Sequence, residues 1–252
     1  MNDERLPVVE SDRLPSGGGP ASAGRSLGGG ADGGGSAPQR VDTSARRLVA
    51  TLALAGALAG LVIVLVHQWT EPRIQAHRAR VLREAVYEVL AGPERYERAF
   101  LVDGAFTTRT PAADTSNLER VYVGFDAAGR PTGIAVTGEA AGFQDVIRLI
   151  FGFDPSRGEV LGMKVLESKE TPGLGDKIEK DSAFVAGFRG AAAPLVGVKA
   201  ANAGGAEGEV DMITGATISS RAVIDVINRR LDTLGAPMTE FWERAVIAEG
   251  SR

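Results

Sequence analysis

Residues Leu48 to Val66 form an uninterrupted apolar run without a single charged residue, LVATLALAGALAGLVIVLV. As a helix rising 1.5 Å per residue, this run would be about 28 Å long, close to the thickness of a bilayer's hydrocarbon core. Trp69 follows it, where an amphipathic ring favours the membrane interface. A buried core helix is disfavoured because the remaining chain is too small to cover a helix that is apolar on every face. The sequence therefore predicts a membrane segment over residues 45–69, in contact with lipid.

This segment is better explained as an uncleaved anchor than as a cleaved signal peptide. The stretch before it is too long for a leader, and the Ala-x-Ala matches fall inside the run. That stretch, residues 1–44, is rich in Gly, Ser and Ala, and we expect it to be a disordered tail because it cannot bury enough surface to offset its ordering entropy. Arginines flank the run on both sides, so the positive-inside rule does not orient it.

The composition excludes several kinds of chemistry. The chain has no Cys, which rules out disulfides, thiolate-held clusters and cysteine nucleophiles. Its two histidines, His67 and His77, lie beside the anchor, so the rest of the chain has no imidazole for a metal site or a Ser–His pair. A net charge of -4 disfavours nucleic acid as a partner. Any redox chemistry would therefore come from an organic cofactor held by oxygens, amides and apolar contacts.

A second helix is expected after the anchor, over a linker of residues 70–98. Pro72 suits its first turn, and Gly92-Pro93 would stop it. Its apolar residues recur at helical spacing and form one stripe, made of Val81, Leu82, Ala85, Val86, Val89 and Leu90. We expect this stripe to pack either on the following domain or on the transmembrane helices of a partner.

Residues 99–237 are predicted to form one α+β domain with an antiparallel sheet and flanking helices. Two hairpins are expected in tandem, with strands over 121–125, 132–137, 146–153 and 160–166. A helix is predicted from Ser219 to Leu234, closed by Gly235 and Pro237. The C-terminal tail, residues 238–252, allows one more short helix over 239–248.

The segment from Asp211 to Arg221, DMITGATISSR, leads directly into that helix. Gly215 and Ala216 are small enough to let another group approach the backbone. Thr217 is expected about one residue before the helix, where free amides and the positive end of the dipole favour a phosphate. Ser219 or Ser220 can cap the same end. A helix-capping loop without further function remains the alternative.

A second segment, KETPGLGD from Lys169 to Asp176, follows the last predicted strand. Pro172-Gly173 fixes a turn, and Gly175 permits a second unusual backbone angle. Such a rigid turn can accept a planar ring or position backbone amides against it. A plain strand-to-helix connection is the alternative.

Taken together, the two segments resemble the G subunit of the Rnf-type electron transport complex and, more loosely, the C subunit of the sodium-translocating NADH:quinone reductase. In both, a Ser/Thr-Gly-Ala-Thr motif carries FMN through a phosphoester to its last Thr, which matches Thr217 here. The resemblance covers roughly residues 45–235. It implies a cofactor site made of the two motifs, namely Thr217, Thr214, Gly215, Ala216 and Asp211 with Glu170, Thr171, Gly173, Leu174 and Gly175.

The resemblance also implies how the chain matures and where it resides. A separate metal-dependent flavin transferase would move an FMN group from FAD onto the Thr217 hydroxyl, so Thr217 is an acceptor. Asp211 would help the transferase or its metal, or would simply make an Asx-type loop contact. The chain would be a single-pass protein of the inner (cytoplasmic) membrane, with its FMN domain on the extracytoplasmic, periplasmic side. Its partners would be other membrane subunits of an electron transport complex.

Three functions remain open. The leading one is an electron-carrier subunit of an ion-translocating oxidoreductase, in the translocase class, rather than a stand-alone enzyme. The second is a flavinylated, membrane-anchored extracytoplasmic reductase outside such a complex. The third is a nonredox anchored binding module. Covalent flavin separates the third from the others, and copurification with multispan subunits separates the first from the second.

Overall fold

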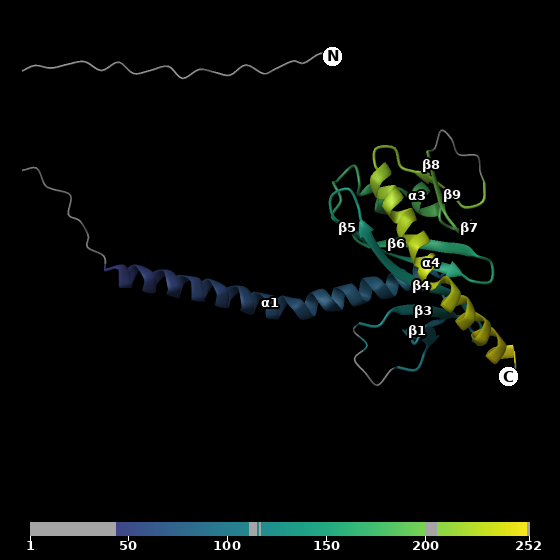
Figure 1. Ribbon diagram of the computed structural model, residues 1–252, viewed down its shortest axis with the longest axis horizontal. Helices are drawn as coiled ribbons and strands as arrows, with labels where there is room; N and C mark the ends of the chain where they lie inside the picture. Colours follow the sequence, from purple (N-terminus) through teal and green to yellow (C-terminus); the bar gives the residue numbers. More distant parts are fainter. Residues whose placement is uncertain (1–43, 111–114, 116, 200–205, 251–252) are drawn as a thin grey trace, which may run out of the picture. The chain divides into compact units, whose positions relative to one another are not determined.

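The computed structural model describes residues 44–110, 115, 117–199 and 206–250 (Figure 1). The expected disordered tail lies outside these residues, except for its last position. The chain divides into two units, residues 1–59 and 60–252, and the boundary falls inside the first helix. The elements are α1 (Ala45–Val89), β1 (Arg95–Val102), β2 (Ala105–Thr107), β3 (Arg120–Phe125), β4 (Pro131–Ala141), β5 (Val146–Asp154), β6 (Glu159–Glu167), α2 (Lys177–Lys180), α3 (Ser182–Ala186), β7 (Ala191–Ala192), β8 (Val196–Lys199), β9 (Glu209–Met212) and α4 (Thr217–Gly250).

Helix α1 has the length and composition needed to cross a membrane, and it is the one such helix in the described part of the chain. Its most apolar stretch is not buried at all. Leu52 and Ile63 are 73% and 69% exposed, and leaving many such side chains in water is unfavourable. This exposed apolar surface agrees with the expected membrane segment.

The prediction of a separate linker helix that starts near Glu71 is wrong, because α1 is continuous and Pro72 lies inside it. An interior proline removes one helical hydrogen bond and typically costs about 3 kcal/mol or more. The helix nevertheless continues through the proline, and Gln75 Nε2 donates to Glu71 Oε1 at 2.9 Å across it. The predicted stop is confirmed: Gly92 N donates to Tyr87 O at 2.7 Å, in a Schellman-type ending.

The main sheet has seven antiparallel strands in the order β2-β1-β3-β4-β5-β6-β7. Both predicted hairpins are confirmed, as β3–β4 and β5–β6. Strands β1 and β2 are not predicted by the sequence, and residues 95–98, assigned to the helical linker, begin β1. The separate parallel pair β8–β9 is also not predicted.

Alternate side chains of the sheet pack against different helices, as the two-residue period of a strand requires. Val123, Val136 and Phe151 belong to a core shared with α4. Tyr122, Ala135 and Ile150 point to the opposite face and pack against the end of α1. The sheet is therefore covered by α4 on one face and by the last turns of α1 on the other.

The close approach of α1 to the sheet depends on glycines. A Cβ atom on Gly152 would collide with the backbone carbonyl of Val89, and one on Gly133 would collide with Leu161 and crowd Leu90. Backbone atoms cannot move aside as a flexible side chain can, so Gly152 is required for this packing.

Helix α4 does not end at Gly235 and Pro237 as predicted but continues to Gly250 with Pro237 inside it. The reason is tertiary packing, which outweighs the cost of the proline. Met238 and Trp242 are buried beyond the proline, and Phe241 packs edge-to-face on Phe106 with ring centroids 6.4 Å apart. The short C-terminal helix expected from the sequence is thus the end of α4.

Candidate functional site

The two sequence motifs meet at one cleft of about 300 Å³. The connection between β6 and α2 forms one side of this cleft, and the first turn of α4 with its preceding loop forms the other. Five of the predicted site residues line it, namely Leu174, Gly175, Gly215, Ala216 and Thr217. Three further residues complete the lining, namely Phe143, Ile218 and Ser219.

Thr217 is the first residue of α4 itself, whereas the sequence predicts it about one residue before the helix. The turn before it is closed by the Ala216 N–H, which donates to Ile213 O at 3.0 Å, and Gly215 supplies the positive φ of 87°. The Ser220 N–H then donates to Ala216 O at 2.8 Å as the first helical bond. By helix geometry the amides of residues 217–219 precede that bond, and together with the dipole they favour an anion beside the Thr217 hydroxyl.

Ser219 and Ser220 do not cap these amides, contrary to the prediction. Both are buried, and their hydroxyls bond elsewhere. Ser220 Oγ accepts from Ile213 N at 3.2 Å and so ties the loop to the helix. Ser219 Oγ donates to Glu170 Oε2 at 2.6 Å. The serine hydroxyls therefore leave the first backbone amides of α4 available to a ligand in the cleft.

Glu170 joins three segments beneath the cleft. Its carboxylate accepts from the Ser219 hydroxyl on α4 and from the backbone amides of Gln144 at 3.0 Å and Asp145 at 3.4 Å, in the β4–β5 connection. Burial alone would raise the pKa of Glu170, but the bonds from Ser219 and from these amides hold that pKa below its usual range. An ionised carboxylate therefore fixes the first turn of α4 against two loops.

Two glycines make room for this buried carboxylate. A Cβ on Gly175 or on Gly142 would collide with a carboxylate oxygen of Glu170. Gly175 is thus needed for space rather than for an unusual backbone angle, since it is not among the residues with positive φ. That finding corrects the predicted role of Gly175, while Gly173, with φ of 78°, does have such an angle.

The rim of the cleft is unusually apolar for an exposed surface. Phe143, Ile218 and Leu174 are 68%, 57% and 51% exposed. They come from the β4–β5 connection, from α4 and from the β6–α2 connection, so three separate segments place apolar groups around Thr217. This arrangement suits a planar apolar ring held at the surface.

A second hollow of about 400 Å³ borders Thr217 on its other side. Arg221, Asp225 and Arg229 of α4 line it, together with the small residues Ala140 and Ala141. Thr217 and Ile218 are common to both hollows. Thr217 therefore borders both an apolar cleft and a hollow whose lining includes two arginines and one aspartate.

The other predicted site residues lie outside the cleft lining. Asp211 is an exposed residue of β9, and Thr214 is exposed in the loop that follows. Thr171 Oγ1 donates to Gln144 Oε1 at 2.8 Å, which adds a second link between the loops that Glu170 joins. Gly173 N donates to Asp176 Oδ1 at 2.7 Å within the turn.

Phe143 and Ile218 are site residues that the sequence reasoning misses. Phe143 stands alone among small and polar neighbours, and an isolated aromatic residue in such a loop is a usable signal. Ile218 offers no such signal, because an apolar residue near a helix start normally packs inward. Ser219 is predicted only as a cap, and its bond to Glu170 joins residues far apart in the sequence.

Comparisons with known proteins agree with this geometry. Residues 142–232 match the family model described as FMN-binding domain. The chain is 34% identical over 189 residues to the G subunit of the ion-translocating oxidoreductase complex from Pectobacterium atrosepticum, an alignment that covers 74% of this chain and 88% of that protein. Its identity to the corresponding G subunit from Shewanella loihica is 31% over 211 residues, covering 81% and 97%.

The crystal structure of Shewanella oneidensis NqrC has a similar fold, with a TM-score of 0.50 and 19% identity, covering 61% of this chain and 91% of that chain. This likeness concerns the fold, an antiparallel sheet with flanking helices. The alignments to the sequence relatives extend over most of both chains. The chain therefore belongs to the family of G subunits of ion-translocating oxidoreductase complexes and contains an FMN-binding domain.

Proposed function

We propose that the chain is a membrane-anchored flavoprotein subunit that carries FMN as a phosphoester on Thr217 and passes electrons within an ion-translocating oxidoreductase complex. The observation that carries this proposal is that both motifs line one cleft and that Thr217 is among its lining residues. The names of the relatives supply the class of complex.

The residues at the cleft fit FMN. Phe143, Leu174 and Ile218 offer apolar contact to a ring, and the amides at the start of α4 offer hydrogen bonds to a phosphate. A cleft of about 300 Å³ is at the small end of ligand sites, so the cofactor would be only partly enclosed. An ester bond makes retention independent of affinity, which suits such an open site.

Attachment would form a bond between Thr217 Oγ and the FMN phosphorus. The bond that breaks is the phosphoanhydride of FAD, AMP leaves, and the hydroxyl proton is released. A separate metal-dependent flavin transferase is proposed to catalyse this step, as the resemblance to the family implies. The described residues that line the cleft include no His, Asp, Glu or Lys, and Asp225 lines only the neighbouring hollow. The chain's own contribution is to present the Thr217 hydroxyl at a helix start fixed by Glu170 and Ser219.

Bound FMN would supply one-electron redox chemistry. We propose that α1 anchors the chain as a single-pass protein of the cytoplasmic membrane, with the anchor in residues 45–69 and the FMN domain on the extracytoplasmic side. Its length and exposed apolar surface support the anchor. Anchoring would keep the cofactor at a limited distance from carriers in the other membrane subunits.

The test is fluorescence of covalent flavin in denaturing gels, after coexpression with a flavin transferase. Thr217→Ala should abolish the band, while Thr217→Ser, which keeps a hydroxyl, should retain it. Thr214→Ala is the matched control, since Thr214 is exposed and outside the cleft lining. Equal flavin on wild type and Thr217→Ala would refute the assignment. If flavin is attached to wild type alone, copurification with multispan subunits would distinguish a subunit of a complex from an independent reductase.

A further inference from the structure

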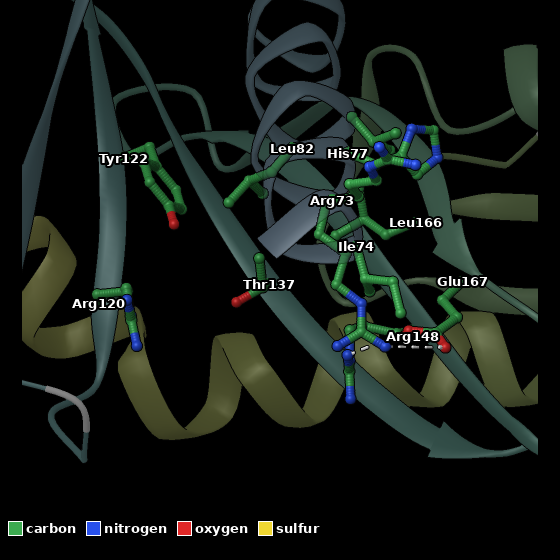
Figure 2. Close-up of a pocket in the computed structure, with 12 residues that line it drawn as sticks. Arg73, Ile74, His77, Leu82, Arg120, Tyr122, Thr137, Arg148, Leu166 and Glu167 are labelled. Atoms are coloured by element: carbon green, nitrogen blue, oxygen red, sulfur yellow. Dashed lines mark hydrogen bonds and ion pairs between the residues drawn. The ribbon is translucent and has the colours of Figure 1, made fainter. Parts of the chain in front are cut away.

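A larger hollow of about 720 Å³ lies on the face of the sheet opposite α4 (Figure 2). We call it the α1 wedge. On the helix it is lined by residues between Arg73 and Leu82, and on the sheet by Arg120, Tyr122, Arg148 and Leu166. It is separated from the cleft at Thr217 by the sheet itself, because Tyr122 packs with the α1 cluster while the start of α4 packs with the other core.

The burial of α1 against the sheet decreases toward the apolar end of the helix. Along the helix, Ala85 and Val86 are fully buried against the sheet, whereas Ile74 is 38% exposed. The helix therefore touches the sheet at its last turns and departs from it toward the membrane segment. The resulting gap has apolar walls, including Ile74, Leu82 and Leu166.

Positive charge is concentrated around these apolar walls. Four arginines line the wedge, namely Arg73, Arg78, Arg120 and Arg148, against one glutamate, Glu167. Glu167 is shared, at 3.3 Å from Arg148 and 3.7 Å from Arg78, and Arg148 also pairs with Glu139 at 3.2 Å. Arg73 lies over the Trp69 ring at 4.5 Å. In a chain of net charge -4, the charges of Arg73 and Arg78 at this site favour an anionic occupant.

Hydroxyl groups add directional contacts. Tyr122 and Thr137 lie among the lining residues, and the Tyr122 hydroxyl points into the hollow in Figure 2. Burial raises the pKa of Tyr122, so the hydroxyl keeps its proton at neutral pH and can donate to a carboxylate. The wedge thus combines apolar walls with donors suited to carboxylates.

Distance along α1 distinguishes a protein occupant from a lipid. At 1.5 Å per residue, Arg73 lies about 10 Å and Leu82 about 24 Å beyond Val66, the end of the apolar run. Headgroups extend only about 5–8 Å beyond the hydrocarbon on each side. A lipid headgroup would meet the near edge at most, whereas a polypeptide leaving the bilayer beside α1 would run the whole length of the wedge.

We propose that the α1 wedge is the docking site for an acidic, amphipathic segment of a partner membrane subunit that leaves the bilayer beside α1. Apolar side chains of that segment would cover Ile74 and Leu82, and its carboxylates would meet Arg73 and Arg78. This inference rests on the proposed place of the chain in a multisubunit complex.

The experiment uses the full chain expressed with the other subunits of its complex. A photoreactive benzoylphenylalanine replaces Ile74, and the control carries it at Tyr87, which has a similar exposure on α1 but does not line the wedge. After irradiation in the membrane, the adduct is identified by mass spectrometry. An adduct from position 74, to a segment of another membrane subunit rich in Asp or Glu, supports the inference. Adducts only to lipid, to a second copy of this chain or to a segment without carboxylates overturn it.

Charge reversal provides the second measurement. Arg73→Glu should lower the amount of co-isolated membrane subunit by about tenfold, because the new carboxylate would repel the carboxylates of the docked segment. Arg83→Glu makes the same charge change on an exposed α1 residue outside the wedge lining and should leave co-isolation unchanged. Equal co-isolation of the two variants overturns the inference.

Flavin attached to Thr217 is scored in the same samples. All wedge variants should retain it, since the wedge and the cleft lie on opposite faces of the sheet. An adduct at position 74 on a chain without flavin would refute the proposed cofactor role and leave the docking site standing. Flavin on Thr217 without an adduct at position 74 would refute the docking site and leave the cofactor role standing.

Discussion

Replacing Glu170 by Gln tests whether the buried carboxylate organises the site. Glutamine has nearly the same shape, so the change removes the charge and one acceptor oxygen without opening a cavity. The carboxylate accepts two short hydrogen bonds, from Ser219 at 2.6 Å and from Gln144 at 3.0 Å, and a longer one from Asp145 at 3.4 Å. Bonds to charged groups exceed neutral ones by about 1 kcal/mol each, so the two short bonds give an expected loss of about 2 kcal/mol.

The assay is urea unfolding of the flavin-free full chain in detergent, followed by tryptophan fluorescence in a Trp69→Phe background, so that the signal comes from Trp242, which is buried on α4. A loss of about 2 kcal/mol would lower the midpoint by roughly 1 M urea, given ordinary slopes for domains of this size. Glu94→Gln is the control, because it makes the same charge change at an exposed position. Equal midpoints for the two variants would refute the role of Glu170.

A double-mutant cycle with Ser219→Ala isolates the bond itself. If Glu170 and Ser219 act through their hydrogen bond, the double variant should be less destabilised than the sum of the single variants, by about 1 kcal/mol. Strict additivity would show that the two residues act separately.

The pH dependence of stability gives an independent check of the charge. The folded pKa of Glu170 lies below its ordinary value of 4.5, so its stabilising contribution is complete above that value and is lost as pH falls through the folded pKa. Wild type should therefore lose stability more steeply than Glu170→Gln below about pH 4.5. Parallel curves would contradict an ionised, hydrogen-bonded carboxylate.

Two further substitutions distinguish a residue that supports the site from a residue on the rim of the cleft. Gly175→Ala should lower unfolding stability by about 1–3 kcal/mol and reduce flavin attachment, because the new Cβ would collide with the Glu170 carboxylate; unchanged attachment would contradict this. Phe143→Ala should change stability by less than about 0.5 kcal/mol, since the ring is 68% exposed, yet should shift the visible absorption spectrum of the attached flavin. An unaltered spectrum would show that Phe143 does not contact the cofactor.

The periodic and local features of the fold were predictable from the sequence. The apolar run of α1, the stripe that ends at Gly92 and the two hairpins each depend on residues close together in the chain. The predicted helix boundaries at Pro72 and Pro237 are both wrong. At Pro237 the local effect of the proline is outweighed by packing, because Met238 and Trp242 are buried beyond it. Strands β1 and β2 are not predicted, because they depend on pairing with β3 and with each other rather than on a local sequence pattern.

The site was predictable to a similar degree. The motif around Thr217 and the turn around Gly175 were identified, and the structure brings them to one cleft. The hydrogen bond between Ser219 and Glu170 is not predictable in this way, because it joins residues 49 positions apart. Such contacts follow from the chain path, which neither composition nor periodicity determines.

The most direct test of the central claim is mass spectrometry of the peptide that contains Thr217, after coexpression with a flavin transferase. We predict a mass increase equal to FMN less one water, with fragmentation that places it on Thr217 and not on Thr214, Ser219 or Ser220. An unmodified Thr217 peptide, from a chain whose transferase modifies a control substrate in the same cells, would contradict covalent attachment at this site.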